Sequence, residues 1–175
     1  MEIIDQHHII DGILNQHHEA LGLDLLAYSG HCYRVLNYMR FLGMDEDDLD
    51  LALVALPFHD LAVWTEKSMD YLEPSFLLAK SYVEEKELDL DINHLRIIIL
   101  GHHKTSKIDQ SPVAELLRKA DLIDLSKGMI RFGLSKAKIA EVKSAMPYYG
   151  FQSIIMRKVI VHAIKHPFKP FPMLS

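Results

Sequence analysis

Residues 29–43, SGHCYRVLNYMRFLG, carry the pattern on which the predicted fold rests. Ser29 can cap the start of a helix, and Gly43 stands where helices commonly end. Between them, apolar residues recur at the spacing of one helical face: Val35, Leu36 and Met39. The stretch therefore predicts an amphipathic helix over residues 31–42.

Helical spacing also prevails on both sides of this stretch, with glycine and proline at the joints. The pattern predicts helices over residues 5–21, 45–56, 75–87, 111–127, 135–146 and 150–165, and one more that Asp91 caps and Gly101 ends. Alternating strand patterns are nearly absent. The sequence has no internal repeat and no long linker in its 175 residues. We therefore predict an all-α fold, a single compact multi-helix bundle spanning residues 1–175.

Composition narrows the function. The formal net charge of -5 argues against a binder of polymeric nucleic acid, which needs a basic surface. No apolar run approaches the roughly 20 residues that cross a bilayer, and the acidic start of the chain does not resemble a secretory signal. One cysteine excludes a disulfide within the chain. We expect a cytoplasmic protein without a membrane partner, and the 11 histidines direct attention to metal ligands.

The pair His59-Asp60 follows Pro57 at a predicted break between helical segments. Imidazole nitrogen and carboxylate oxygen are both good ligands for divalent ions. Neighbours on a helix diverge by about 100°, so the pair converges on one ion only at an irregular turn, which Pro57 can supply. The alternative is a surface dipeptide without function.

Two residues far away in the sequence favour the interpretation of His59-Asp60 as metal ligands. His31 lies in the first turn of the predicted helix over residues 31–42. Asp121 lies in LLRKADLIDL with apolar neighbours on both sides, which places its carboxylate near the core. An unpaired buried carboxylate is costly, so Asp121 needs a partner. A salt bridge to Arg118 or Lys119 is the alternative, although both neighbours point elsewhere on the helix.

The segments SGHCYRV, PFHDLA and RKADLIDL, in this order, resemble the signature of the HD-domain superfamily of metal-dependent phosphohydrolases. The resemblance covers residues 25–128 and leaves helices at 135–165 as a C-terminal addition. It implies that a divalent ion (Mn, Mg, Co, Ni, Zn or Fe) is held by four residues: His31, His59, Asp60 and Asp121.

Members of this superfamily with two metals carry further ligands at positions that resemble Glu73 and the pair His102-His103. The resemblance implies that Glu73, in place of a histidine, and one of the two histidines hold a second ion, which Asp60 would bridge to the first. The alternatives are a helix N-terminal carboxylate for Glu73 and an exposed helix end for the histidines. We expect one ion and leave the second open.

Hydrolysis of a phosphate ester also requires cationic and proton-transferring groups. Arg34 lies one turn from His31 and could clamp a phosphate, as could Lys104. Asp124 lies one turn from Asp121 and could orient a ligand histidine or act as acid or base. Each of these three has the alternative of an ordinary surface charge.

The sequence thus predicts a metal-dependent phosphohydrolase for a nucleotide or another small phosphate ester, and a homodimer is left open. After His59-Asp60, the residues Val63 and Trp64 depart from the cyclic-dinucleotide and guanosine-tetraphosphate hydrolases of the superfamily. The substrate therefore stays open. Two alternatives remain: a di-iron oxygenase of the same superfamily, and a catalytically silent protein that binds metal or nucleotide as a regulator.

Overall fold

The computed structural model describes residues 2–168 and 172. Its α-helices are α1 (His8–Gln16), α2 (His18–Leu21), α3 (Leu25–Phe41), α4 (Leu49–Phe58), α5 (Ala62–Thr65), α6 (Leu72–Glu85), α7 (Ile92–Gly101), α8 (Pro112–Leu125), α9 (Lys136–Ala145) and α10 (Phe151–Lys165). Short 3-10 turns precede α3 at Gly22–Asp24 and α4 at Glu46–Asp48. No strand occurs among the described residues, so the all-α prediction is confirmed.

Side-chain caps begin several helices where the sequence predicts them. Asp91 accepts hydrogen bonds from the backbone of the first turn of α7. Ser111 caps α8 ahead of Pro112, which needs no amide hydrogen at a helix start. Ser135 caps α9 in the same way. These caps satisfy amide groups that a helix start leaves without partners.

Several predicted helix boundaries differ from the observed ones, most clearly at the first two predicted helices. The segment predicted as one helix over residues 5–21 is divided at His17 into α1 and α2. Ser29 is no cap, because α3 begins at Leu25 and continues through Ser29. The buried side chains of Ala27 and Tyr28 explain this extension, since they pack in the core before the predicted start.

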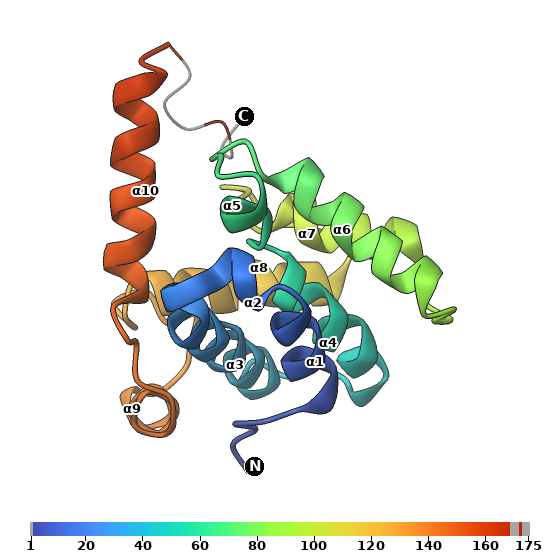
Figure 1. Cartoon of the computed structure of the whole chain (residues 1–175). Helices are drawn as coiled ribbons and strands as arrows, with labels where there is room; N and C mark the ends of the chain where they lie inside the picture. The colour runs from blue at the N-terminus through green and yellow to red at the C-terminus, as the bar shows by residue number, and fades with distance from the viewer. Residues whose placement is uncertain (1, 169–171, 173–175) are drawn as a thin grey trace.

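Helix α4 lies at the centre of the bundle and contacts α1, α3, α6 and α7 (Figure 1). All its residues from Leu51 to Phe58 are buried, including Pro57 in the last turn. Pro57 has no amide hydrogen to donate within the helix. The helix nevertheless continues to Phe58, and the amide of His59 still donates to the carbonyl oxygen of Ala55 at 2.9 Å before residues 59–61 form a turn. Helix α3 packs along α8 on one side of α4. The turn after α4 therefore lies next to α3, α7 and α8.

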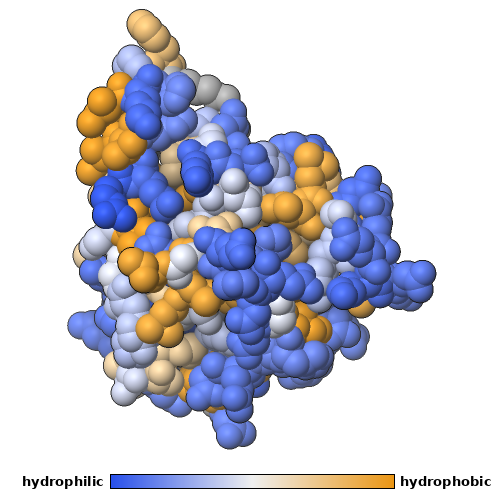
Figure 2. All heavy atoms as spheres, viewed as in Figure 1, coloured by the Kyte–Doolittle hydropathy of each residue, from blue (hydrophilic) through white to orange (hydrophobic). Residues whose placement is uncertain are grey.

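Helix α10 stands at the edge of the bundle (Figure 1). Among the described residues of α10, only Phe151, in the first turn, is buried. Helix α10 exposes the apolar side chains of Met156, Ile160, Val161 and Ile164. Orange spheres gather over the region of this helix in Figure 2. None of the helices in the described part of the chain has the length and apolar character that crossing a bilayer demands.

Candidate metal centre

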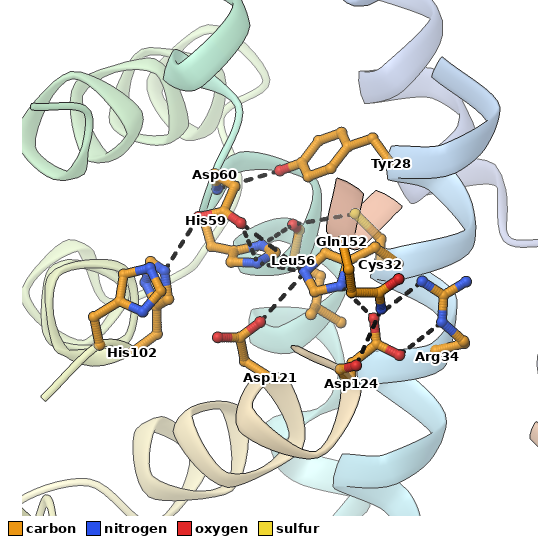
Figure 3. Close-up of polar contacts among 12 residues, drawn as sticks. Tyr28, Cys32, Arg34, Leu56, His59, Asp60, His102, Asp121, Asp124 and Gln152 are labelled. Atoms are coloured by element: carbon orange, nitrogen blue, oxygen red, sulfur yellow. Dashed lines mark hydrogen bonds and ion pairs between the residues drawn. The ribbon is translucent and has the colours of Figure 1, made fainter. Parts of the chain in front are cut away.

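Separate elements place histidine and aspartate side chains around one buried point (Figure 3). His31 comes from α3, His59 and Asp60 from the turn after α4, His102 from the end of α7, and Asp121 from α8. Each is at most 5 % exposed. The structure thus brings together the four residues that the resemblance implies for a first ion, together with one histidine of the second set.

The ligand atoms of this cluster lie close to one another. The Nε2 atom of His31 is 3.1 Å from Nε2 of His59 and 3.4 Å from Oδ1 of Asp121. Asp60 directs Oδ2 to Nε2 of His59 at 3.5 Å and Oδ1 to Nε2 of His102 at 3.2 Å. Three overlapping triads, each with ligand atoms within 4.8 Å of one another, could hold an ion: His31, His59 and Asp121; His59, Asp60 and His102; His102, His103 and Asp121.

Hydrogen bonds at the far ring nitrogen orient three of the histidines. Nδ1 of His31 donates to Oδ2 of Asp124 at 2.7 Å. Nδ1 of His59 donates to the carbonyl oxygen of Leu56 at 2.5 Å, and Nδ1 of His102 donates to that of Ile99 at 2.6 Å. Carbonyl and carboxylate oxygens only accept, so Nδ1 carries the proton in each ring and Nε2 faces the cluster. This is the usual arrangement of histidines that bind metals.

The cluster is rich in acceptors and poor in donors, which fits a cation. Two Nε2 lone pairs cannot face each other at 3.1 Å, as in His31 and His59, without a positive charge between them. Oδ1 of Asp121 is buried and accepts no hydrogen bond from the described residues. A divalent ion would satisfy these atoms with nitrogen and oxygen ligands of the kind it prefers. The residues present therefore fit the ion that the sequence implies.

Burial governs the charges of these groups. Desolvation lowers the pKa of His59 to about 3 and outweighs the opposing effect of Asp60, so the ring is neutral. Desolvation alone would raise the pKa of Asp60, but His59 and His102 together hold it well below its usual range. Burial raises the pKa of Asp121 to about 7. Asp60 raises the pKa of His102 against the effect of burial, which indicates that a positive charge is favourable beside this carboxylate.

Arg34 does not face the cluster as a phosphate clamp. It is fully buried, and its Nε and Nη2 donate to the two carboxylate oxygens of Asp124 at 2.7 and 3.0 Å. Nη1 donates to the carbonyl oxygens of Met146 and Pro147. The expectation that Arg34 binds phosphate is therefore corrected: Asp124 and the backbone occupy its donors. Asp124, in contrast, takes the orienting position that was one of its two expected roles.

Gly30 makes this arrangement sterically feasible. A Cβ at this position would lie 3.0 Å from Nη1 of Arg34 and 3.3 Å from the carbonyl oxygen of Pro147. The absence of a side chain lets the segment after α9 approach α3, so that Arg34 can reach its carbonyl groups. Nothing in the local sequence around Gly30 indicates this role.

Glu73 lies away from the cluster and does not meet the expectation for a second-ion ligand. Its carboxylate accepts two hydrogen bonds from Arg96 of α7, at 2.7 and 2.8 Å, and about half of its side chain is exposed. The physical reason is the first turn of α6, which directs Glu73 outward to a cationic partner. Lys104 is likewise exposed, in the turn after α7.

The two adjacent histidines differ. His102 is 2 % exposed and contacts Asp60, whereas His103 is half-buried and its Nε2 lies 2.5 Å from the hydroxyl of Tyr71. Burial, together with the neighbouring His102, lowers the pKa of His103 to about 3. Both belong to the third triad with Asp121. His102 therefore belongs to two of the three triads, and His103 belongs to one.

Several residues that support the centre carry no signal in the sequence alone. The phenyl ring of Phe151 stacks on His31 at 4.0 Å, and the hydroxyl of Tyr28 accepts a hydrogen bond from the amide of Asp60. A local signal did exist for two other contacts. His59 and His102 each lie three residues after the carbonyl group that they bind, at the end of a helix, where carbonyl groups lack partners.

An all-α bundle whose helices and turns bring buried histidine and aspartate side chains together is a helical domain with a centre that could hold a metal ion. The chain matches the model of the HD domain over residues 28–126, which is more than half of its length, and it belongs to this family. Neither the curated proteins nor the solved structures contain a match to the chain.

Proposed function

We propose that this protein hydrolyses small phosphate esters, nucleotides among them, with the help of a divalent ion held by His31, His59, Asp60 and Asp121. One observation carries the proposal: buried acceptor atoms converge at 3.1–3.5 Å from separate elements without enough donors to satisfy them. Membership of the HD domain family, most of whose members are metal-dependent hydrolases, supports the same proposal.

The residues around the centre would have different roles in this reaction. A bound divalent ion lowers the pKa of a coordinated water and neutralises negative charge on phosphoryl oxygens. His31 and His59 present neutral Nε2 atoms, because their Nδ1 protons are engaged by Asp124 and by the carbonyl of Leu56. Burial excludes bulk water and strengthens the attraction between the carboxylates and a cation. Arg34 fixes Asp124 and thereby the orientation of the ring of His31.

A second ion is part of the proposal. The two carboxylate oxygens of Asp60 face different histidines, Oδ2 toward His59 and Oδ1 toward His102. Asp60 could therefore help to hold a second ion as well as the first, and two metals together would stabilise the attacking and leaving oxygens of a phosphoryl transfer. His102 and His103 would contribute to the second ion, and Glu73 would not, because Arg96 binds it. Lys104 remains a candidate for contact with substrate from its exposed position.

Metal analysis of the purified protein, followed by a panel of phosphate esters under each added metal, tests the proposal. Phosphate release with Mn, Mg, Co, Ni, Zn or Fe is the expected result, and it should disappear in Asp60→Asn. Two bound irons with a mixed-valence signal would instead indicate the oxygenase alternative. Tight nucleotide binding without turnover under any metal would indicate a regulatory protein.

A further inference from the structure

Helix α10 carries an apolar stripe that the bundle does not cover. Only Phe151 is buried among its described residues. Met156, Ile160 and Ile164 follow one another at intervals of four residues and are 58, 50 and 75 % exposed. Side chains at this spacing lie on the same face of a helix. An exposed apolar stripe therefore runs along most of the length of α10.

The exposure of this stripe leaves α10 with little packing of its own. The helix has 15 residues. Isolated helices of up to about 12–15 residues are marginal in water, and most helices in proteins are stabilised by the packing of an apolar face. Large exposed apolar patches mark surfaces that bind a partner. A second surface that covers the stripe would supply the packing that the bundle does not provide.

The apolar surface continues on the segment that leads into α3. Leu23 is 103 % exposed and Leu26 is 58 % exposed. Between them, Asp24 accepts a hydrogen bond from Nε1 of Trp64 at 2.9 Å, and the ammonium group of Lys158 lies 5.0 Å from the centre of the same ring. Because Lys158 belongs to α10, Trp64 joins the two segments. The stripe and the two leucines are therefore neighbouring parts of one surface.

These two parts of the surface carry opposite charge. Residues 1–33 contain acidic residues but no lysine or arginine, whereas residues 142–175 contain lysine and arginine but no acidic residue. Arg157 and Lys165 are exposed on α10, and Glu19 is exposed on α2. The surface thus has a basic apolar part on α10 and an acidic apolar part over residues 19–26. Opposite potentials of this kind are complementary across an interface.

We propose that two copies of this chain associate through this surface about a two-fold axis. The basic part of each copy lies on the acidic part of the other. Both sides of a two-fold interface are the same patch, so a patch with one basic and one acidic part is complementary to itself. A pair formed by α10 alone would place one basic helix against another, which charge repulsion disfavours. The inference does not depend on the proposed function.

A second copy fits this surface better than a lipid bilayer does. Anionic lipids attract basic amphipathic helices. The carboxylates of Glu19 and Asp24, beside the exposed leucines, would be repelled by the same headgroups. The surface therefore requires a partner that presents basic and acidic groups side by side, and this chain presents them.

The contact would also hold one wall of the candidate metal centre. The ring of Phe151, in the first turn of α10, stacks on His31 at 4.0 Å. Just before α10, the carbonyl oxygens of Met146 and Pro147 accept hydrogen bonds from Arg34. A partner that fixes α10 would therefore fix the ring that covers one of the candidate ligands.

Sedimentation equilibrium of the full chain measures the association. The wild-type protein should have twice the mass of one chain, without further growth at higher concentration, because a two-fold pair is closed. Ile160→Asp should weaken the pair by at least about 100-fold, because each copy would bury a charge without a partner. Leu77→Asp is the matched control and should remain dimeric. Leu77 is 53 % exposed on α6, on the other side of the bundle from α10 (Figure 1).

An exchange of charges tests the pairing of the two parts without an apolar variant. Arg157→Glu places acidic groups opposite one another, and Glu19→Lys places basic groups opposite one another. Each variant alone should weaken dimerisation about ten-fold at low ionic strength. An equimolar mixture of the two variants should restore the affinity, because both contacts of the mixed pair again join opposite charges. Circular dichroism checks that each variant keeps its helical content.

Several outcomes would overturn the inference. They are a wild-type protein that stays monomeric, masses beyond two copies, equal behaviour of Ile160→Asp and Leu77→Asp, and a mixture of charge variants that does not recover the affinity. Cosedimentation of a monomeric wild type with vesicles that contain phosphatidylserine, and its loss in Ile160→Asp, would assign α10 to a membrane surface instead.

Discussion

The carboxylate of Asp124 bridges Arg34 and His31 in the core. Oδ2 accepts hydrogen bonds from Nδ1 of His31 at 2.7 Å and from Nη2 of Arg34 at 3.0 Å, while Oδ1 accepts from Nε of Arg34. Burial would raise the pKa of Asp124, but its bonds to His31 and Arg34 keep it lowered. The fully buried ion pair of Arg34 and Asp124 thus places the proton of His31 on Nδ1. The Nε2 atom of His31 is thereby left free to face the candidate metal centre.

Asp124→Asn should weaken metal binding. Asparagine removes the charge that holds the Nδ1 proton of His31, so the ring loses its fixed orientation. Changes of this kind beside a ligand histidine reduce metal affinity by about 10–100-fold. Competition titration with a fluorescent chelator measures the effect. Unchanged affinity in a folded variant would contradict the orienting role of Asp124.

Arg34→Met should destabilise the protein even without metal. The variant leaves the buried carboxylate of Asp124 without its strongest partner, which costs about 3–5 kcal/mol when a buried pair is broken. Denaturant unfolding in EDTA measures the loss. Arg96→Met is the matched control, because its pair with Glu73 is about half exposed and such pairs contribute about 0–1 kcal/mol. Similar losses in both variants would show that the burial of Arg34 has no special effect.

His102→Gln and Glu73→Gln should differ in metal stoichiometry. His102 contacts Asp60 inside the cluster, whereas Glu73 binds Arg96 at the surface. If the parent protein shows two binding steps, only the tighter step should remain in His102→Gln, and both should remain in Glu73→Gln. Isothermal titration with Mn²⁺ measures the steps. Loss of a step in Glu73→Gln would restore Glu73 as a ligand.

The ion pair of Glu115 and Arg118 should make the stability of the fold depend on acid pH. Its hydrogen bonds with Arg118 lower the pKa of Glu115 from 4.5 to about 2, with burial opposing. A lowered folded-state pKa contributes stability above the unfolded value, and that stability is lost as the pH falls from about 4.5 toward 2. Glu115 also accepts a hydrogen bond from the amide of Ile108, so its protonation loosens the loop after the two adjacent histidines.

Unfolding free energies of Glu115→Gln between pH 5 and pH 2.5, measured in EDTA, check this prediction. The variant should be less stable than the wild type at the upper pH, and the difference should shrink toward the lower pH. The exposed carboxylate of Glu141 supplies the control, since Glu141→Gln should leave the pH profile unchanged. A constant difference across the range would contradict the prediction.

The family and the fold class could be read from the sequence. Helical periodicity is a local property, so the spacing of apolar residues and the caps at Asp91, Ser111 and Ser135 predict helices without knowledge of their partners. The order of His31, His59-Asp60 and Asp121 can also be recognised in the sequence alone. Asp121 needed a partner because its neighbours are apolar, and the structure indeed buries it beside His31.

The tertiary structure decided what local patterns cannot contain. The partner of Arg34 lies 90 residues away and that of Glu73 lies 23 residues away, so only the packing of α3 on α8 and of α6 on α7 shows that Asp124 and Arg96 engage them. A sequence determines which groups a helix carries, but the direction in which each group points depends on the neighbour against which that helix buries its apolar face.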